Sequence, residues 1–188
     1  LYFIDPKEED PNKPTQVWTQ GETESNSCWF PTIDSPNQKT SQEIYMTVPN
    51  KYVTLSNGTL KNQTSNPNGT RTDYWKMDQK HAPYLVFMGV GEYSITKDSW
   101  NGLEVNYYVE PEFEPEAKAI FGNTPEMMTF FSDITGIPYP WDKYSQIVVR
   151  DFVSGAMENT TAVVHAEDAH QKKGQLIDNN EWESTIAH

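Results

Sequence analysis

The pattern of apolar and polar positions changes near residue 110. Before that point, short runs rich in β-branched and aromatic residues are separated by Asn, Gly and Pro, which is typical of antiparallel strands. We predict strands over residues 43–48, 52–56, 70–77, 84–95 and 103–109. The first half of the chain is therefore expected to form a β-sandwich or a curved sheet.

Three Asn-Gly pairs lie between or beside these runs. Asn57-Gly58 suits a two-residue hairpin, because both central positions of such a turn need positive φ. Asn68-Gly69 and Asn101-Gly102 offer the same turn chemistry further along the chain.

The pattern becomes helical after Pro111. Helices are predicted over residues 114–122 and 125–135, and Thr124 can cap the second, which Gly136 ends. Apolar residues recur along that helix at steps of three and four, namely Met127, Phe130, Phe131 and Ile134. We expect this apolar face to lie in the core.

Two further strands, at residues 147–149 and 161–164, lie on either side of a loop that contains Gly155 to Asn159. A last helix is expected to begin at Asp178 and to run to His188, where the chain stops. The whole pattern predicts an α+β fold with two parts, residues 1–109 and 110–188. Because the chain stops within a predicted helix, we expect it to be a fragment.

Composition and charge exclude several functions. The 188 residues carry 14 Lys and Arg against 27 Asp and Glu, and the net charge of -13 would repel nucleic acid. The single Cys28 excludes an intrachain disulfide, and no apolar run approaches the roughly 20 residues of a transmembrane helix. Few Lys and Arg with abundant Asn, Thr, Trp and Tyr favour an exported protein, periplasmic or at the cell surface.

The loop Gly155-Ala156-Met157-Glu158-Asn159 places a carboxylate among small residues. Small residues let an extended peptide approach the backbone, and Glu158 can then accept charge-assisted hydrogen bonds from an ammonium group. The alternative is a tight turn in which Glu158 caps a backbone N–H, and five residues alone favour that alternative.

The pentapeptide, the downstream His188 and flanking blocks such as Trp29-Phe30-Pro31 resemble the aminopeptidase N family of zinc metallopeptidases. In that family the pentapeptide is the exopeptidase motif, and the resemblance implies that Glu158 holds the free α-amine of a peptide. The family has a helix with H-E-x-x-H about thirty residues further on, and His188 matches its first zinc ligand. The general-base Glu would directly follow His188, so no catalytic residue is expected within the chain.

The resemblance runs from about Trp18 to His188 and implies further site residues. Gln20 and Glu22 stand where the family places two residues that reach into the active site, so Glu22 would be a second amine anchor. Gly155, Ala156, Met157 and Asn159 complete the implied substrate site. The chain departs from the family at Thr160 and Thr161, where many members carry an aromatic residue and a Gly.

The resemblance also implies the architecture and the partners. Residues 1–109 would be the C-terminal part of an N-terminal β domain, and residues 110–188 the start of a thermolysin-like catalytic domain. The parent would use one zinc ion and cleave peptides with a free N-terminus, whereas the chain alone would be inactive. The alternative is a non-catalytic binding or scaffold protein that keeps the fold.

Three histidines are assigned no site. His165 and His170 are five residues apart and would not share a helix face, so we interpret their segment as a solvated loop. His81 is interpreted as a turn residue.

Overall fold

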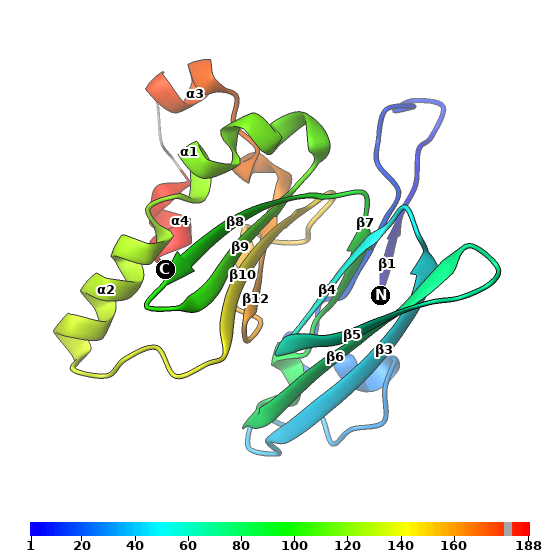
Figure 1. Cartoon of the computed structure of the whole chain (residues 1–188), viewed down its shortest axis with the longest axis horizontal. Coiled ribbons are helices and arrows are strands. Elements are labelled where there is room, and N and C mark those ends of the chain that lie inside the picture. The colour runs from blue at the N-terminus through cyan, green and yellow to red at the C-terminus, as the bar shows by residue number, and fades with distance from the viewer. Residues whose placement is uncertain (179–181) are drawn as a thin grey trace. The chain divides into compact units, whose positions relative to one another are not determined.

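The computed structural model describes residues 1–178 and 182–188, and it forms two compact units (Figure 1). The first unit comprises Leu1–Glu92 and Glu158–Ala162, and the second comprises Tyr93–Met157 and Val163–His188. Antiparallel and mixed sheets dominate over short helices, so the predicted α+β class is confirmed. The domain boundary predicted between residues 109 and 110 stays a prediction.

The first unit is built from two antiparallel sheets. One has the strand order β1 (Tyr2–Ile4), β2 (Gln16–Trp18), β7 (Met88–Gly91) and β4 (Val53–Ser56). The other has the order β3 (Thr40–Pro49), β6 (Thr70–His81) and β5 (Thr59–Ser65). Two 3-10 helices, η1 (Asn26–Cys28) and η2 (Pro83–Leu85), lie in the connections. The indole of Trp75 in β6 donates to Thr54 in β4 at 3.0 Å and so joins the two sheets.

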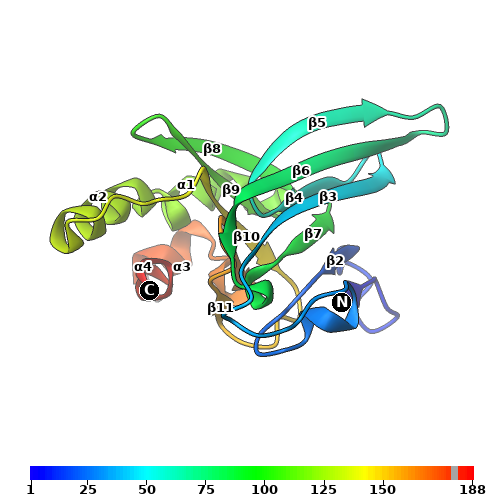
Figure 2. The same cartoon turned by 90° about the horizontal axis from the view of Figure 1, so that it is seen from below.

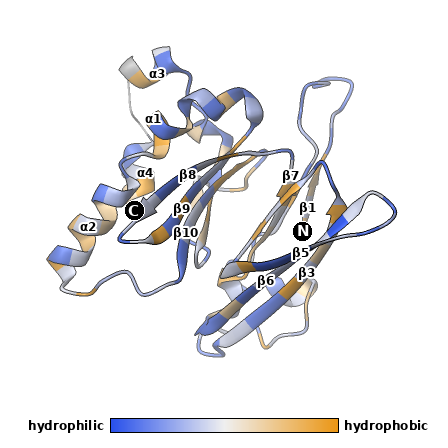
Figure 3. Cartoon of the chain, viewed as in Figure 1, coloured by the Kyte–Doolittle hydropathy of each residue, from blue (hydrophilic) through white to orange (hydrophobic). Residues whose placement is uncertain are grey.

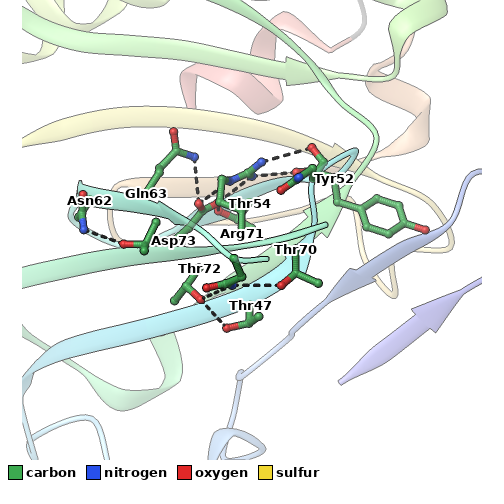
Figure 4. A network of polar contacts seen from close by, with 12 residues as sticks. Thr47, Tyr52, Thr54, Asn62, Gln63, Thr70, Arg71, Thr72 and Asp73 are labelled. Carbon is green, nitrogen blue, oxygen red and sulfur yellow. Dashed lines mark hydrogen bonds and ion pairs between the residues drawn. The ribbon is translucent and has the colours of Figure 1, made fainter. Parts of the chain in front are cut away.

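A buried carboxylate connects three strands of this unit (Figure 4). The side chain of Asp73 in β6 is fully buried and accepts hydrogen bonds from Arg71 at 2.6 and 2.9 Å. Thr54 of β4 and Gln63 of β5 donate to the same carboxylate at 2.6 and 2.9 Å. Burial alone would raise the pKa of Asp73, but these hydrogen bonds outweigh it and hold the pKa below its usual range.

The predicted strands are found, with one exception, and strands β1, β2 and β5 lie outside the predicted segments. The segment 84–95 is not one strand. Its start lies in η2, its middle forms β7, and its last two residues begin β8 (Ser94–Trp100). Strand β5 was not predicted, since it is polar and nearly all of its residues are exposed. No alternation of apolar residues marks such a strand.

The three Asn-Gly pairs behave differently. Asn101 and Gly102, with φ of 49° and 81°, join β8 to β9 (Leu103–Val109) in a two-residue hairpin. Gly69 has a φ of 76° in the turn between β5 and β6. The hairpin prediction for Asn57-Gly58 is wrong, because β4 pairs with β7 and β5 pairs with β6, so this segment crosses between sheets.

The second unit has a five-stranded sheet in the order β11 (Ala156–Met157), β12 (Ala162–Ala166), β10 (Lys143–Val149), β9 and β8. Strands β9 and β10 are parallel, and the connection between them contains η3 (Pro111–Glu116), α1 (Ala117–Phe121) and α2 (Thr124–Thr135). The helical segments η4 (Glu167–Ala169), α3 (Lys173–Asp178) and α4 (Glu183–Ala187) follow β12. Figure 2 shows α1 and α2 beside this sheet. The core between them includes Val105, Tyr107, Ile120, Phe121, Val148 and Ile186.

Helix α2 is amphipathic as predicted, but the prediction that its apolar face is core is wrong. Phe130, Phe131 and Ile134 are exposed by 57%, 44% and 68%, whereas Met128 is buried in the core. Apolar and polar positions alternate along the helix in Figure 3. The spacing identifies an apolar stripe but not what packs on it. Gly136 ends the helix with a φ of 68°, as expected of a left-handed cap.

The last predicted helix corresponds to two helices. α3 ends at Asp178 and α4 begins at Glu183, while part of the predicted start lies outside the described residues. None of the helices in the described part of the chain is long and apolar enough to cross a membrane.

The interpretation of the histidine segments as loop and turn is wrong, because the three side chains are buried. His165 is 0% exposed; its Nε2 bonds to Gln146 Oε1 at 2.8 Å, and Trp182 Nε1 donates to its Nδ1 at 3.0 Å. His170 stacks on Phe113 with ring centroids 4.1 Å apart. Burial lowers the pKa of His165 and of His170 to about 3 and that of His81 to about 4. All three imidazoles are therefore neutral in the folded chain near pH 7.

Candidate functional site

Residues Glu158–Ala162, which include the end of the pentapeptide and the two threonines after it, belong to the first unit. Asn57 Nδ2 donates to the carbonyl of Thr160 at 2.6 Å, and the Gly58 N–H donates to Thr161 Oγ1 at 2.7 Å. His81 Nδ1 lies 3.2 Å from Thr160 Oγ1, and its Nε2 lies 3.0 Å from Gln42 Oε1. Because the amide oxygen can only accept, Nε2 carries the proton and Nδ1 accepts from the hydroxyl.

Thr161 adopts a left-handed conformation with a φ of 65°. This region is unfavourable for a β-branched residue and easy for glycine, so the bond from Gly58 helps to hold the strained backbone. The departure from the family pattern at this position is thus a costly one in backbone energy.

The start of the pentapeptide, Gly155 to Met157, belongs to the second unit. There Ala156 and Met157 pair with His165 and Val164. The Ala166 N–H donates to the Gly155 carbonyl at 2.9 Å. Gly155 is exposed, and a Cβ added there would meet only a ring carbon of Trp182 at 4.0 Å. The backbone at Gly155 is therefore open, whereas the Met157 side chain is buried.

The carboxylate of Glu158 is exposed. Within the described part of the chain it has neither a hydrogen-bond donor nor an ion-pair partner. The alternative in which Glu158 caps a turn would require a backbone N–H donor, and the structure shows none. Its neighbour Asn159 is 0% exposed and has no partner for its side-chain amide among the described residues.

The turn that carries Glu22 is fixed to η2. Asn26 Nδ2 donates to the carbonyls of Pro83 and Val86 at 2.8 and 3.1 Å, and its Oδ1 accepts from the Trp29 indole at 2.7 Å. Gly21 packs so closely that a Cβ there would lie 2.4 Å from the Tyr84 carbonyl. Glu22 itself is exposed, and Gln20 is half-buried.

The phenol of Tyr84 is affected by the charges of both predicted amine anchors. Burial is the largest cause that raises its pKa, and the negative charges of Glu158 and Glu22 raise the pKa further. Both carboxylates therefore lie within electrostatic reach of one side chain in η2. The charges of Glu22 and Glu158 act on the same tyrosine, although 135 intervening positions separate the two residues in the sequence.

His188 is exposed at the end of α4, and its backbone N–H donates to Ser184 at 3.0 Å. An imidazole is a suitable zinc ligand, but a zinc site needs three or four protein ligands. The described residues contain no group of three His, Cys, Asp or Glu side chains that could hold a metal ion. These described residues therefore do not form a complete zinc site.

Two family models match the chain in consecutive segments. The peptidase M1 N-terminal domain matches residues 3–85, and the peptidase family M1 domain matches residues 120–188. The chain belongs to peptidase family M1. The resemblance to the aminopeptidase N family is thereby confirmed, and the two units of this M1 chain contain most of the two matched segments.

Curated relatives of the M1 chain are aminopeptidases by name. Glutamyl aminopeptidase of Sus scrofa is 32% identical over 144 residues, which cover 73% of this chain and 15% of that protein. Endoplasmic reticulum aminopeptidase 1 of Homo sapiens is 28% identical over 152 residues, which cover 80% of this chain and 16% of that protein. The chain thus spans about a sixth of the length of these relatives.

The sequence did not indicate three residues that build this site. Asn26 and Asn57 are buried asparagines whose bonds run to distant carbonyls, and Asn57 was assigned to a hairpin. Tyr84 was assigned to a strand. The only local signal was Pro83, whose preference for the first turn of a helix could have indicated η2.

Proposed function

We propose that this M1 chain supplies the amine-binding part of a zinc-dependent aminopeptidase, in which Glu158 and Glu22 hold the free α-ammonium of a peptide. The proposal is supported by two exposed carboxylates, Glu22 and Glu158, whose charges both act on the phenol of Tyr84. Asn26 and Asn57 donate hydrogen bonds to the carbonyls of Pro83 and Leu85, on either side of that tyrosine. In the described part of the chain neither carboxylate has a cationic partner. A pair of negative charges without a counter-ion favours a cationic ligand.

The ammonium determines which peptide bond is presented for cleavage. A peptide α-amine has a pKa of roughly 7.7 to 8.0, so it is largely charged near neutral pH. When its position is fixed, the first peptide carbonyl lies at a set distance from it, and only that bond is presented.

The described residues would contribute less to the metal site than to substrate binding. His188 would be one zinc ligand, and zinc chemistry in peptidases consists of polarising a carbonyl and activating water. The other ligands and the general base would come from residues other than those described. The proposed contribution of the described residues is therefore to bind and position the substrate.

Replacing Glu158 with glutamine in the full-length protein should lower kcat/KM on peptides with a free amine by more than tenfold. A charge-assisted hydrogen bond contributes about 1.5 to 3 kcal/mol, which corresponds to roughly 10- to 150-fold. The measurement is the initial rate on a short alanine peptide and on its N-acetylated counterpart. The acetylated peptide should not be cleaved by the unmodified protein.

Glu167→Gln is a matched control, because Glu167 follows β12 in the second unit and is not a predicted anchor. An unchanged rate for Glu158→Gln would remove the anchor assignment. Efficient cleavage of the acetylated peptide would point instead to an endopeptidase.

The alternative function is a non-catalytic binding or scaffold protein with the same fold. The residues after His188 in the full-length protein discriminate the two: Glu-x-x-His supports the enzyme, and any other sequence supports the scaffold.

A further inference from the structure

We propose that the hydrogen bond between Trp182 and His165 positions the helix that precedes His188, and so sets the place of this zinc ligand relative to the pentapeptide. The inference rests on the proposed function, because that function makes His188 a zinc ligand. It adds two positioning residues, which act through the backbone of α4 and of β12.

Helix α4 is too short to fix its own place. It has five residues, Glu183–Ala187, and so short a helix is not stable on its own in water. Its position therefore depends on contacts with the rest of the second unit. Ile186 is buried in the core, and Asn123 Nδ2 donates to the first side chain of the helix at 2.6 Å. A third contact comes from Trp182, directly before the helix. His188 directly follows the helix, so these contacts also determine where its side chain can lie.

His165 connects this helix to the strand of the pentapeptide. Its backbone lies opposite Ala156 in the pairing of β11 with β12, and the Ala166 N–H donates to the Gly155 carbonyl at 2.9 Å. Its side chain accepts from Trp182 Nε1 at 3.0 Å. A Cβ built on Gly155 would lie 4.0 Å from the Trp182 ring. The residue directly before α4 therefore lies beside the pentapeptide and bonds to the strand that pairs with it.

The bond from Trp182 is the first of a chain of hydrogen bonds that can run in one direction only. An indole nitrogen only donates, so Nδ1 of His165 accepts and its Nε2 carries the proton. This Nε2 donates to Gln146 Oε1 at 2.8 Å, and Gln146 Nε2 donates to Thr124 Oγ1 at 2.8 Å. The chain ends where Thr124 Oγ1 donates to the Phe121 carbonyl at 2.6 Å.

Burial gives the imidazole in this chain a single orientation. His165 and Gln146 are both fully buried, so each lost bond would leave a buried polar atom without a partner. If the ring turned over, its N–H would face the indole N–H of Trp182, and two donors would meet. His165 therefore offers Trp182 one fixed acceptor, and α4 is held at one place relative to β10 and β12.

The test is Trp182→Phe in the full-length protein, with zinc chloride as the probe. The variant keeps an aromatic ring and removes the N–H donor. We expect the zinc dissociation constant, measured by competition with a chromophoric chelator, to rise roughly 3- to 10-fold, because α4 then holds His188 in place for a smaller fraction of the time. With zinc at saturation, kcat on the free-amine alanine peptide should fall while KM changes by less than twofold, because both amine anchors are intact.

Trp100→Phe is the matched control. Trp100 Nε1 donates to Thr129 Oγ1 at 2.9 Å in the same unit, but this bond joins β8 to α2 rather than to α4. Both substitutions should lower the thermal unfolding midpoint of the zinc-free protein, whereas only Trp182→Phe should weaken zinc binding. When Trp182→Phe is combined with His165→Phe, the loss of zinc-binding free energy should be smaller than the sum of the two single losses, because the two residues act through one bond.

The outcomes separate this inference from the proposed function. If Glu158→Gln lowers kcat/KM as expected but Trp182→Phe binds zinc as tightly as Trp100→Phe, the role of Trp182 is overturned while the amine anchor stands. If the full-length protein binds no zinc at micromolar concentrations, the inference and the proposed zinc-dependent function fail together. Should Trp182→Phe not fold, benzothienylalanine at position 182 replaces the N–H by sulfur and keeps the shape of the indole, and an unchanged zinc affinity there would overturn the inference.

Discussion

Replacing Asp73 with alanine is expected to lower the free energy of unfolding of the first unit by about 3 kcal/mol. The variant leaves the guanidinium of Arg71, only 18% exposed, without its carboxylate and removes the acceptor of Thr54 and Gln63. Removing one partner of a buried pair costs more than the pair itself contributes, because the remaining charge stays desolvated. Urea unfolding monitored by tryptophan fluorescence measures the loss.

Asp78→Ala is the matched control for this prediction. Asp78 lies on the same strand and pairs with Lys76 at 2.9 Å, but its side chain is 66% exposed. An exposed pair contributes about 0 to 1 kcal/mol, so the control should change stability little. If the two substitutions lowered the free energy of unfolding equally, the prediction that burial makes the Asp73 carboxylate more important for stability would be contradicted.

The folded chain is expected to lose stability steeply as the pH falls below about 6.5. In the unfolded chain His81, His165 and His170 would bind protons near that pH, whereas burial lowers their pKa values in the folded chain to between about 3 and about 4. The unfolded state then binds more protons, so unfolding is favoured as acid is added. Each histidine contributes up to about 1.4 kcal/mol per pH unit between these values.

Urea unfolding at pH 7.5, 6.0 and 5.0 measures this dependence. His165→Gln should reduce the slope by the contribution of one proton, although it lowers stability at pH 7.5 by removing bonds to Gln146 and Trp182. His188→Gln is the control, because that side chain is exposed. A stability that is constant from pH 7.5 to 5.0 would contradict the burial of three neutral imidazoles.

The sequence predicted local structure well wherever the cause is local. The hairpin at Asn101-Gly102 and the left-handed end of α2 at Gly136 follow from backbone preferences of two or three residues. The strand at β9 follows from its alternation of apolar residues. The same reasoning was wrong for Asn57-Gly58, because an Asn-Gly pair also suits a buried crossing between sheets when its side chain finds distant partners.

The candidate site could be predicted only in part. Glu158 and Glu22 are indicated by resemblance, but the bonds of Asn26 and Asn57 to the carbonyls of Val86 and Leu85 are marked by no local pattern. The buried histidines were missed for the same reason. Burial of a polar side chain is decided by partners far away in the sequence, and a single sequence does not show which residues meet.

In the segment from Glu158 to Ala162, Thr160 and Thr161 accept hydrogen bonds from the Asn57 amide and the Gly58 N–H, which precede them by 103 positions, whereas residues 155–157 belong to the other unit. The structure of the pentapeptide and of the two threonines after it therefore depends on residues elsewhere in the chain. An engineer who transplants the pentapeptide into a different scaffold would have to bring Asn57, Gly58 and His81 along, or the two threonines after it would lose their hydrogen-bond partners.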